Sequence, residues 1–148
     1  MSQTLTKVLL HVVLSTKNRD AFISTSMESG LYSYIGGVCR NLESPLLAAG
    51  GTANHIHLLI AFGRSVSMAD LVMHLKKDSS RWAKANGCAG FRWQEGYGAF
   101  SIGGSQRRAV VTYIARQKEH HLRMSYEDEF LALLRKYAVE YDPRYIWT

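Results

Sequence analysis

His55 and His57 stand one residue apart in the apolar run Asn54–Ile60. In a β-strand alternate side chains leave by the same face, so both imidazoles point to one side and the apolar side chains Ile56, Leu58 and Ile60 to the other. An apolar strand that holds two nitrogen ligands side by side suits a metal ion that takes few protein ligands and leaves other positions for substrate. The sequence therefore predicts a metal site on this strand.

Tyr113 and Gln117 could supply the rest of the chemistry. On a helix, residues four apart stack on one face a turn from each other, so a phenol nucleophile would lie next to an amide ligand. By chance alone, the histidine spacing arises roughly one time in four, and the Tyr-x-x-x-Gln spacing roughly one in four or five. An exposed glutamine and a tyrosine at the core edge are the alternative, and it is the combination of both pairs that favours a site.

The elements that must position these residues follow from hydrophobic periodicity. We expect strands at 7–14, 46–49, 55–60 and 99–102, and helices at 25–41, from 67 onward, at 106–122 and from 125 onward. Strand, helix, strand, strand, helix, strand is the order of the α+β, ferredoxin-like or RNA-recognition-like fold. We therefore expect an antiparallel sheet with helices packed on it and additional C-terminal helices.

Capping boxes mark the expected helix starts at 25–28, 67–70 and 125–128. The last of these helices would cover the core or form a dimer surface. His11 lies within the first strand, where a hydrogen-bonded core histidine is the simpler interpretation and an outer-shell role near His55 the alternative. Trp93 beside Arg92 could stack on nucleic-acid bases, although core filling is at least as good an explanation.

Composition narrows the class of protein. A chain of 148 residues with 47% hydrophobic side chains suits one domain, which we place at 1–148. The formal charge of +6 favours an anionic partner such as nucleic acid, although it also fits a merely basic soluble protein. Cys39 and Cys88 make no disulfide framework, and we find neither a signal-peptide pattern nor an apolar run long enough for a membrane. We therefore expect a soluble cytoplasmic protein without membrane association.

The sequence also resembles a known protein family. The histidine, hydrophobic residue, histidine pattern at His55–His57, followed by Tyr113–Gln117, is similar to the HUH single-tyrosine transposases of small bacterial insertion sequences, including their REP-associated relatives. Further segments carry the resemblance over most of the chain: Ser15–Arg19, Lys77–Trp82, Trp93–Ser101 and His120–His121. Asn54 departs from the pattern, since the family often has an acidic residue before the first histidine. We expect this difference to change how the outer shell modulates His55 as a metal ligand rather than to abolish metal binding.

The resemblance implies cleavage and rejoining of single-stranded DNA. Tyr113 would attack a phosphodiester to give a 5′-phosphotyrosine and a free 3′-hydroxyl. His55, His57 and Gln117 would hold Mg²⁺ or Mn²⁺, with Mn²⁺ favoured by the nitrogen ligands. It also implies recognition of DNA hairpins, a homodimer, and a tyrosine helix that can complete the partner's site.

Basic side chains offer candidate DNA contacts on two segments. The candidates are Lys17, Arg19, Lys76, Lys77 and Arg81. The alternative for Lys76, Lys77 and Arg81 is that they form an ordinary solvated face of a helix.

Two other functions compete with DNA transposition. One is a non-catalytic nucleic-acid-binding module of the RNA-recognition-like fold, although the expected strands lack that fold's aromatic pattern. The other is a metal-dependent hydrolase that activates water, with Tyr113 structural.

Overall fold

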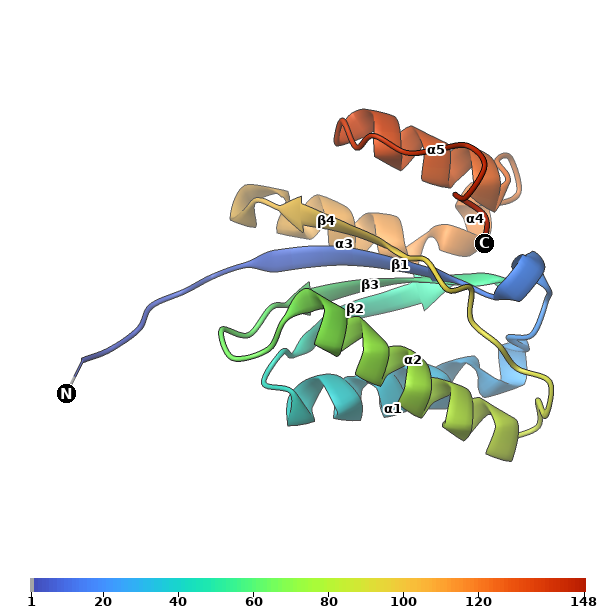
Figure 1. The fold of residues 1–148 in the computed structure, drawn as a ribbon, viewed down its shortest axis with the longest axis horizontal. Coiled ribbons are helices and arrows are strands. Elements are labelled where there is room, and N and C mark those ends of the chain that lie inside the picture. Colours follow the sequence, from blue (N-terminus) through green and yellow to red (C-terminus); the bar gives the residue numbers. More distant parts are fainter. Residues whose placement is uncertain (1) are drawn as a thin grey trace.

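The strands pair in an antiparallel sheet, in the order β2-β3-β1-β4, in a computed structural model that describes residues 2–148 (Figure 1). The first six main elements are β1 (Leu9–Ser15), α1 (Thr25–Asn41), β2 (Leu46–Gly51), β3 (His55–Ala61), α2 (Met68–Ala85) and β4 (Gly98–Ile102). They are followed by α3 (Arg107–Ala115), α4 (Gln117–His120) and α5 (Tyr126–Lys136), with short 3-10 turns η1 (Lys17–Arg19) and η2 (Gly104–Gln106). This order and pairing confirm the expected ferredoxin-like α+β fold.

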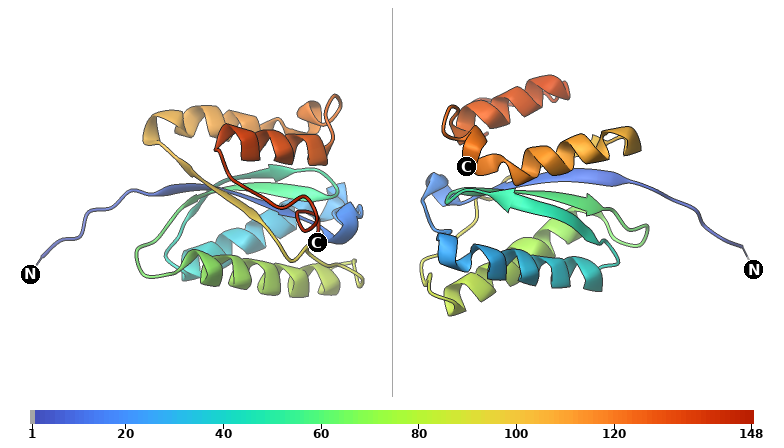
Figure 2. Two further views of the ribbon diagram at one scale, coloured as in Figure 1. Left: turned by 45° about the horizontal axis from the view of Figure 1, so that its top comes forward. Right: turned by 180° about the vertical axis from the view of Figure 1, so that it is seen from behind.

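The sheet separates two layers of helices. Helices α1 and α2 cover one face, and α3, α4 and α5 lie over the other (Figures 1 and 2). Strands β1 and β3 are central, and their register puts Val13 opposite His57 and Ser15 opposite His55. Both central strands are almost entirely buried because helices cover both faces, as the apolar run in β1 predicts.

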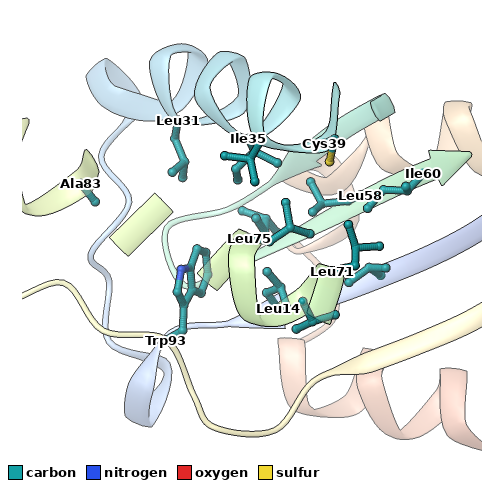
Figure 3. Packing of buried hydrophobic residues seen from close by; sticks show 14 of the residues in the cluster. Leu14, Leu31, Ile35, Cys39, Leu58, Ile60, Leu71, Leu75, Ala83 and Trp93 are labelled. Carbon is teal, nitrogen blue, oxygen red and sulfur yellow. The ribbon is translucent and has the colours of Figure 1, made fainter. Parts of the chain in front are cut away.

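The larger hydrophobic core lies between the sheet and the helices α1 and α2 (Figure 3). Alternate residues of the central strands, such as Leu14 and Leu58, meet Leu31 and Ile35 of α1 and Leu75 of α2. This is the period-two pattern of the strands meeting the helical spacing of the two helices. The two histidines of β3 are left to face the opposite layer.

Trp93 belongs to this larger core rather than to an exposed stacking surface. Its side chain is buried, and its indole Nε1 donates to Ser79 Oγ at 2.9 Å. Between the two sequence-based interpretations, the structure supports core filling.

Two smaller clusters fix the second layer of helices. Ile114 of α3 packs with Leu9, Leu59 and Ile102, and α5 contributes its aromatic and leucine side chains to a cluster with Val13 and Phe100. Helix α3 lies very close to β2, because a Cβ added to Gly50 would fall 2.2 Å from the carbonyl oxygen of Ile114. Glycine at position 50 therefore lets the helix that carries Tyr113 sit against the sheet edge.

The expected continuous helix over 106–122 is wrong. Helix α3 ends at Ala115, and Arg116 has non-helical angles (φ −102°, ψ 19°) with its N–H shared between the carbonyls of Thr112 and Tyr113. The chain then forms the short helix α4, where Lys118 reaches Glu28 at 2.6 Å and the carbonyl of Gly51 at 3.3 Å. These contacts with α1 and β2 accompany the change of direction, and no residue pattern in the segment signals it.

The expected helix caps are confirmed at two of three positions. Ser67 Oγ accepts from the N–H of Asp70, and Ser125 Oγ accepts from that of Asp128, each at 3.1 Å. The cap expected at Thr25 is wrong, because the N-cap of α1 is Ser24 and its side chain makes no capping hydrogen bond. Over residues 2–148, none of the helices combines the length and apolar character needed to span a bilayer.

Candidate metal and nucleophile site

Both histidines of β3 point toward the layer formed by α3, α4 and α5. His55 and His57 are completely buried, and their ring centroids lie 5.1 Å apart. The apolar side chains that alternate with them, Ile56, Leu58 and Ile60, belong to the opposite core. The two-faced strand that the sequence predicts is therefore confirmed.

Hydrogen bonds on the far side of each ring fix both imidazoles. His55 Nδ1 lies 2.8 Å from Asn54 Oδ1 and 2.9 Å from Thr52 Oγ1. His57 Nδ1 lies 2.7 Å from Nε2 of the buried His11, which is thus a hydrogen-bonded core histidine next to the site. Burial lowers the pKa of His57, and burial together with the nearby His57 lowers that of His11 to about 3, so these two rings are neutral.

Tyr113 and Gln117 approach these histidines from α3 and α4 of the same chain. The Gln117 side chain is buried, with Oε1 3.0 Å from His55 Nε2. The Tyr113 ring centroid lies 5.6 Å from that of His57. The residues singled out by their spacing in the sequence therefore lie together, although 56 positions separate His57 from Tyr113 (113 minus 57).

Glu129 of α5 lies at the centre of this group, and sequence reasoning missed it. It is 2% exposed, and its Oε1 lies 2.8 Å from His57 Nε2. Its Oε2 accepts hydrogen bonds from the Tyr113 hydroxyl and from Gln117 Nε2. The available signal was helical spacing, because Glu129 occupies an inward position between the buried Tyr126 and Leu133.

Burial alone would raise the pKa of Glu129, but hydrogen bonds from His121, His55 and His57 outweigh it and hold the pKa well below the usual range of a carboxyl. The carboxylate is therefore charged. Burial, the hydrogen bond to Glu129 and its charge all raise the pKa of Tyr113, so the phenol is protonated at neutral pH.

His121 and His120 also reach Glu129. His121 Nε2 lies 3.1 Å from Oε1, and its pKa is raised because the hydrogen bond and charge of Glu129 outweigh the effect of burial. His120 Nε2 lies 3.2 Å from Oε2, but outside hydrogen-bonding geometry. In the sequence these two histidines contributed only to the family resemblance.

The collected side chains fit a divalent metal ion. Ligand atoms of His55, His57, His121 and Glu129 all lie within 4.8 Å of one another. With the amide oxygen of Gln117 they form a mixed nitrogen and oxygen set of the kind that binds divalent transition metals. The donor chemistry therefore agrees with the metal site expected from the sequence.

Tyr113 also lines two solvent-accessible pockets. A pocket of about 410 Å³ is lined by Tyr113, His11 and Glu129 together with apolar residues of α3 and α5. A groove of about 800 Å³ runs past Tyr113 and the exposed side chains Arg116 and Arg123. A phenol beside two guanidinium groups in an open groove is accessible to an extended anionic ligand.

The candidate DNA contacts on α2 do not lie at this site. Lys77 and Arg81 are exposed on α2, which covers the opposite face of the sheet (Figure 1). Lys17 is half-buried in η1.

Two of these candidates are held by contacts within the chain. Lys76 donates to the carbonyls of Gln94, Glu95 and Gly96, and burial lowers its pKa to about 8. Arg19 donates to the carbonyl of Trp147 and lies over its ring. Both side chains therefore hold neighbouring segments in place.

Comparisons with known proteins agree with this geometry. The family model described as "Transposase IS200 like" matches residues 4–117. No curated protein matches the chain. A candidate transposase from Deinococcus radiodurans R1 is similar in structure, with a TM-score of 0.63 and 20% identity over 79% of this chain and 98% of that one.

A second solved structure is a REP-associated tyrosine transposase bound to a REP hairpin. Its TM-score is 0.61, with 20% identity over 82% of this chain and 74% of that one. At this identity both structures show a common fold. Because the family model covers more than half of the sequence, the chain belongs to the family of IS200-like transposases.

Proposed function

We propose that this transposase cleaves and rejoins single-stranded DNA through a covalent link between Tyr113 and the 5′ phosphate. The observation that carries the proposal is the Tyr113 hydroxyl, which donates to the buried carboxylate of Glu129 beside the histidine pair. The exposure of Tyr113 to a groove with Arg116 and Arg123 gives a DNA strand a route to it.

In the proposed reaction the Tyr113 oxygen attacks phosphorus, and the bond between phosphorus and the 3′ oxygen breaks. The products are a 5′-phosphotyrosine and a 3′-hydroxyl, and the reverse attack by a 3′-hydroxyl rejoins the strand. Because the ester bond is conserved, no external energy source is needed. The phenol gives up its proton to solvent as the new bond forms, and the departing 3′ oxygen takes up a proton from solvent, so that atoms and charge balance.

The same surroundings make the phenolate of Tyr113 unfavourable, since burial and Glu129 raise the pKa of the phenol. Mg²⁺ or Mn²⁺ held by His55, His57 and Gln117 would supply positive charge that polarises the phosphate and favours the phenolate. Arg116 and Arg123 would hold the DNA backbone in the groove.

The substrate we propose is hairpin DNA with a flanking single strand. It is supported by the family and by a structural neighbour that is itself bound to a REP hairpin. Lys17, Arg19, Lys76, Lys77 and Arg81 remain the sequence-based candidates for contact with the hairpin. We also propose a homodimer, for which the molar mass measured by light scattering is the direct test.

The test is a covalent adduct. Wild-type protein incubated with Mn²⁺ and a labelled single-stranded hairpin should give a protein–DNA band on a denaturing gel. Tyr113→Phe should lose the band completely and still bind the hairpin, because only the hydroxyl is removed. Tyr141→Phe, which changes an exposed tyrosine, is the matched control and should keep the adduct.

Each competing function gives a different result. A nucleic-acid-binding module binds the hairpin without cutting it. A water-activating hydrolase gives cut DNA with no attached protein, in the wild type and in Tyr113→Phe alike. An adduct that persists in Tyr113→Phe means that another residue is the nucleophile.

A further inference from the structure

Five candidate ligand atoms, one of them Oε1 of Glu129, include neighbouring pairs spaced like atoms that share one metal ion. Measured from Oε1 of Glu129, the Nε2 atoms of His57, His121 and His55 lie at 2.8, 3.1 and 3.4 Å. Measured from Oε1 of Gln117, the Nε2 atoms of His121 and His55 lie at 2.9 and 3.0 Å. Ligands about 2.1 Å from a common ion are separated by roughly 3.0 Å in an octahedron and roughly 3.4 Å in a tetrahedron.

His121 is placed as a metal-binding histidine would be. His121 Nδ1 lies 2.7 Å from the backbone carbonyl of Met124, which can only accept, so Nδ1 carries the proton. Without an ion, the raised pKa of His121 lets a protonated Nε2 donate to Gln117 Oε1 and Glu129 Oε1; in the neutral ring the lone pair of Nε2 points at these two acceptor oxygens. Lone pairs directed at one another repel, whereas an ion between them attracts both.

His55 has the same arrangement. The hydroxyl of Thr52 donates to Asn54 Oδ1, so both oxygens can accept only from a protonated His55 Nδ1. Its Nε2 faces Gln117 Oε1, so in the neutral ring the lone pair on Nε2 points at that oxygen. A histidine whose Nδ1–H is held by an oxygen while Nε2 is free is the usual form of a histidine bound to metal.

The side-chain amide of Gln117 also directs its oxygen toward the imidazoles. Its Nε2 donates to Glu129 Oε2 at 2.9 Å, which leaves Oε1 facing the imidazoles. The amide cannot satisfy either ring nitrogen as a donor in this orientation. Glu129 thus orients one ligand with one oxygen and presents its other oxygen to the histidines.

We propose that His121 and Glu129 are additional metal ligands, which complete a centre of three imidazoles, one amide and one carboxylate that prefers a divalent transition metal to Mg²⁺. The proposal rests on the function proposed above, because three of the ligands and the tyrosine are shared. Both added ligands lie beyond residue 117, where the match to the family model ends. Nitrogen ligands favour Mn²⁺ or Zn²⁺, whereas Mg²⁺ prefers oxygen and water.

Metal binding by the full-length protein, stripped with chelator, tests the proposal without any measurement of cleavage. Titration calorimetry with Mn²⁺, Zn²⁺ and Mg²⁺ gives the affinities, and the melting temperature with each ion gives an independent readout. We expect Mn²⁺ and Zn²⁺ to bind and raise the melting temperature, and Mg²⁺ at the same concentration to do neither.

Two variants remove one proposed ligand each. Glu129→Gln keeps the shape of the side chain, and His121→Asn changes a ring that is already half-buried. Each should weaken Mn²⁺ binding at least tenfold, since even residues that only orient a metal ligand are worth about 10–100-fold. Glu127→Gln on the same helix and His74→Asn outside the cluster are the controls and should bind as the wild type does.

His57→Ala separates the two proposals. If His57→Ala loses the metal but Glu129→Gln and His121→Asn bind it as the wild type does, the added ligands are wrong and the smaller metal site stands. If the wild type binds no ion at all, His121 and Glu129 form an ion-free pair, and both the three-ligand and the five-ligand metal site are wrong. The role of Tyr113 is decided separately by the adduct.

Discussion

At the scale of single residues, the site is a buried carboxylate surrounded by donors. Glu129 accepts from Tyr113 and Gln117 on one oxygen and faces His57 on the other. A buried carboxylate without such partners would cost several kcal/mol, at least about 3. The stability of this region therefore depends on residues from β3, α3, α4 and α5 being present together.

Part of this site could be predicted from the sequence. His55 with His57, and Tyr113 with Gln117, each carry a local spacing that a strand or a helix converts into a shared face. Glu129 carries no such signal, because it lies 72 positions from His57 and its partners are set by tertiary packing. Its place among apolar neighbours on α5 shows that it points inward, but not what it meets.

The buried imidazoles predict sensitivity to acid in the metal-free protein. The pKa of His11 is lowered from 6.5 to about 3 in the folded state, so between these pH values the unfolded chain takes up a proton that the folded chain does not. His57 acts in the same direction. The free energy of unfolding should therefore fall below pH 6.5, by roughly 1.4 kcal/mol per pH unit for each ring.

Urea titrations between about pH 7 and about pH 4, a range that includes the ordinary histidine pKa, give the slope of the unfolding free energy against pH. His11→Asn should reduce the slope by about one proton, whereas His74→Asn, on α2 outside the cluster, should leave it unchanged. An unchanged slope in His11→Asn would show that His11 is not the group that takes up the proton.

At the scale of elements, the close approach of α3 to β2 positions the tyrosine. Gly50→Ala would put a methyl group 2.2 Å from the carbonyl oxygen of Ile114, so the helix must move away from the sheet. We expect a loss of about 1–3 kcal/mol in the free energy of unfolding, measured by urea denaturation. The adduct yield should fall as well, because Tyr113 directly precedes Ile114.

Gly37→Ala is the matched control for this substitution. A Cβ at Gly37, in α1, meets nothing within 4 Å, and alanine favours a helix by up to about 1 kcal/mol. The control should therefore stabilise the protein slightly. A Gly50→Ala variant as stable as the wild type would mean that α3 can shift along the sheet without loss.

The elements themselves were largely predictable, because strand and helix periods appear directly in the sequence. The break at Arg116 was not, since apolar residues continue at helical spacing up to it and no glycine or proline marks the turn. The cap at Ser24 was missed by one residue because Thr25 and Glu28 match a capping box that the structure does not form.

At the scale of the whole molecule, exposed basic side chains lie on both sides of the sheet, whereas the candidate site lies on one side. Lys77 and Arg81 are exposed on α2, whereas Tyr113 lies in the opposite layer with Arg116 and Arg123. A DNA that contacts both groups must pass around the edge of the sheet. Measuring the salt dependence of hairpin binding decides whether α2 takes part.

Replacing Lys77 and Arg81 with alanine should weaken hairpin binding and lower the slope of log affinity against log salt by about 1 for each lost phosphate contact. Fluorescence anisotropy over a range of salt concentrations provides the measurement. Arg64→Ala, at an exposed position before α2, should leave the slope unchanged. An unchanged slope in the double variant would mean that Lys77 and Arg81 make no phosphate contact, and the groove with Arg116 and Arg123 would be the next candidate.

Helix α5 lies outside the segment that matches the family model, yet it seals one face of the sheet. A fragment cut at residue 117 would lay bare Val13 and Phe100 and would leave Tyr113 without its carboxylate partner. The end of the family-model match is therefore not a boundary for folding. In this chain, the segment that the family model matches is completed by a helix that the model does not match.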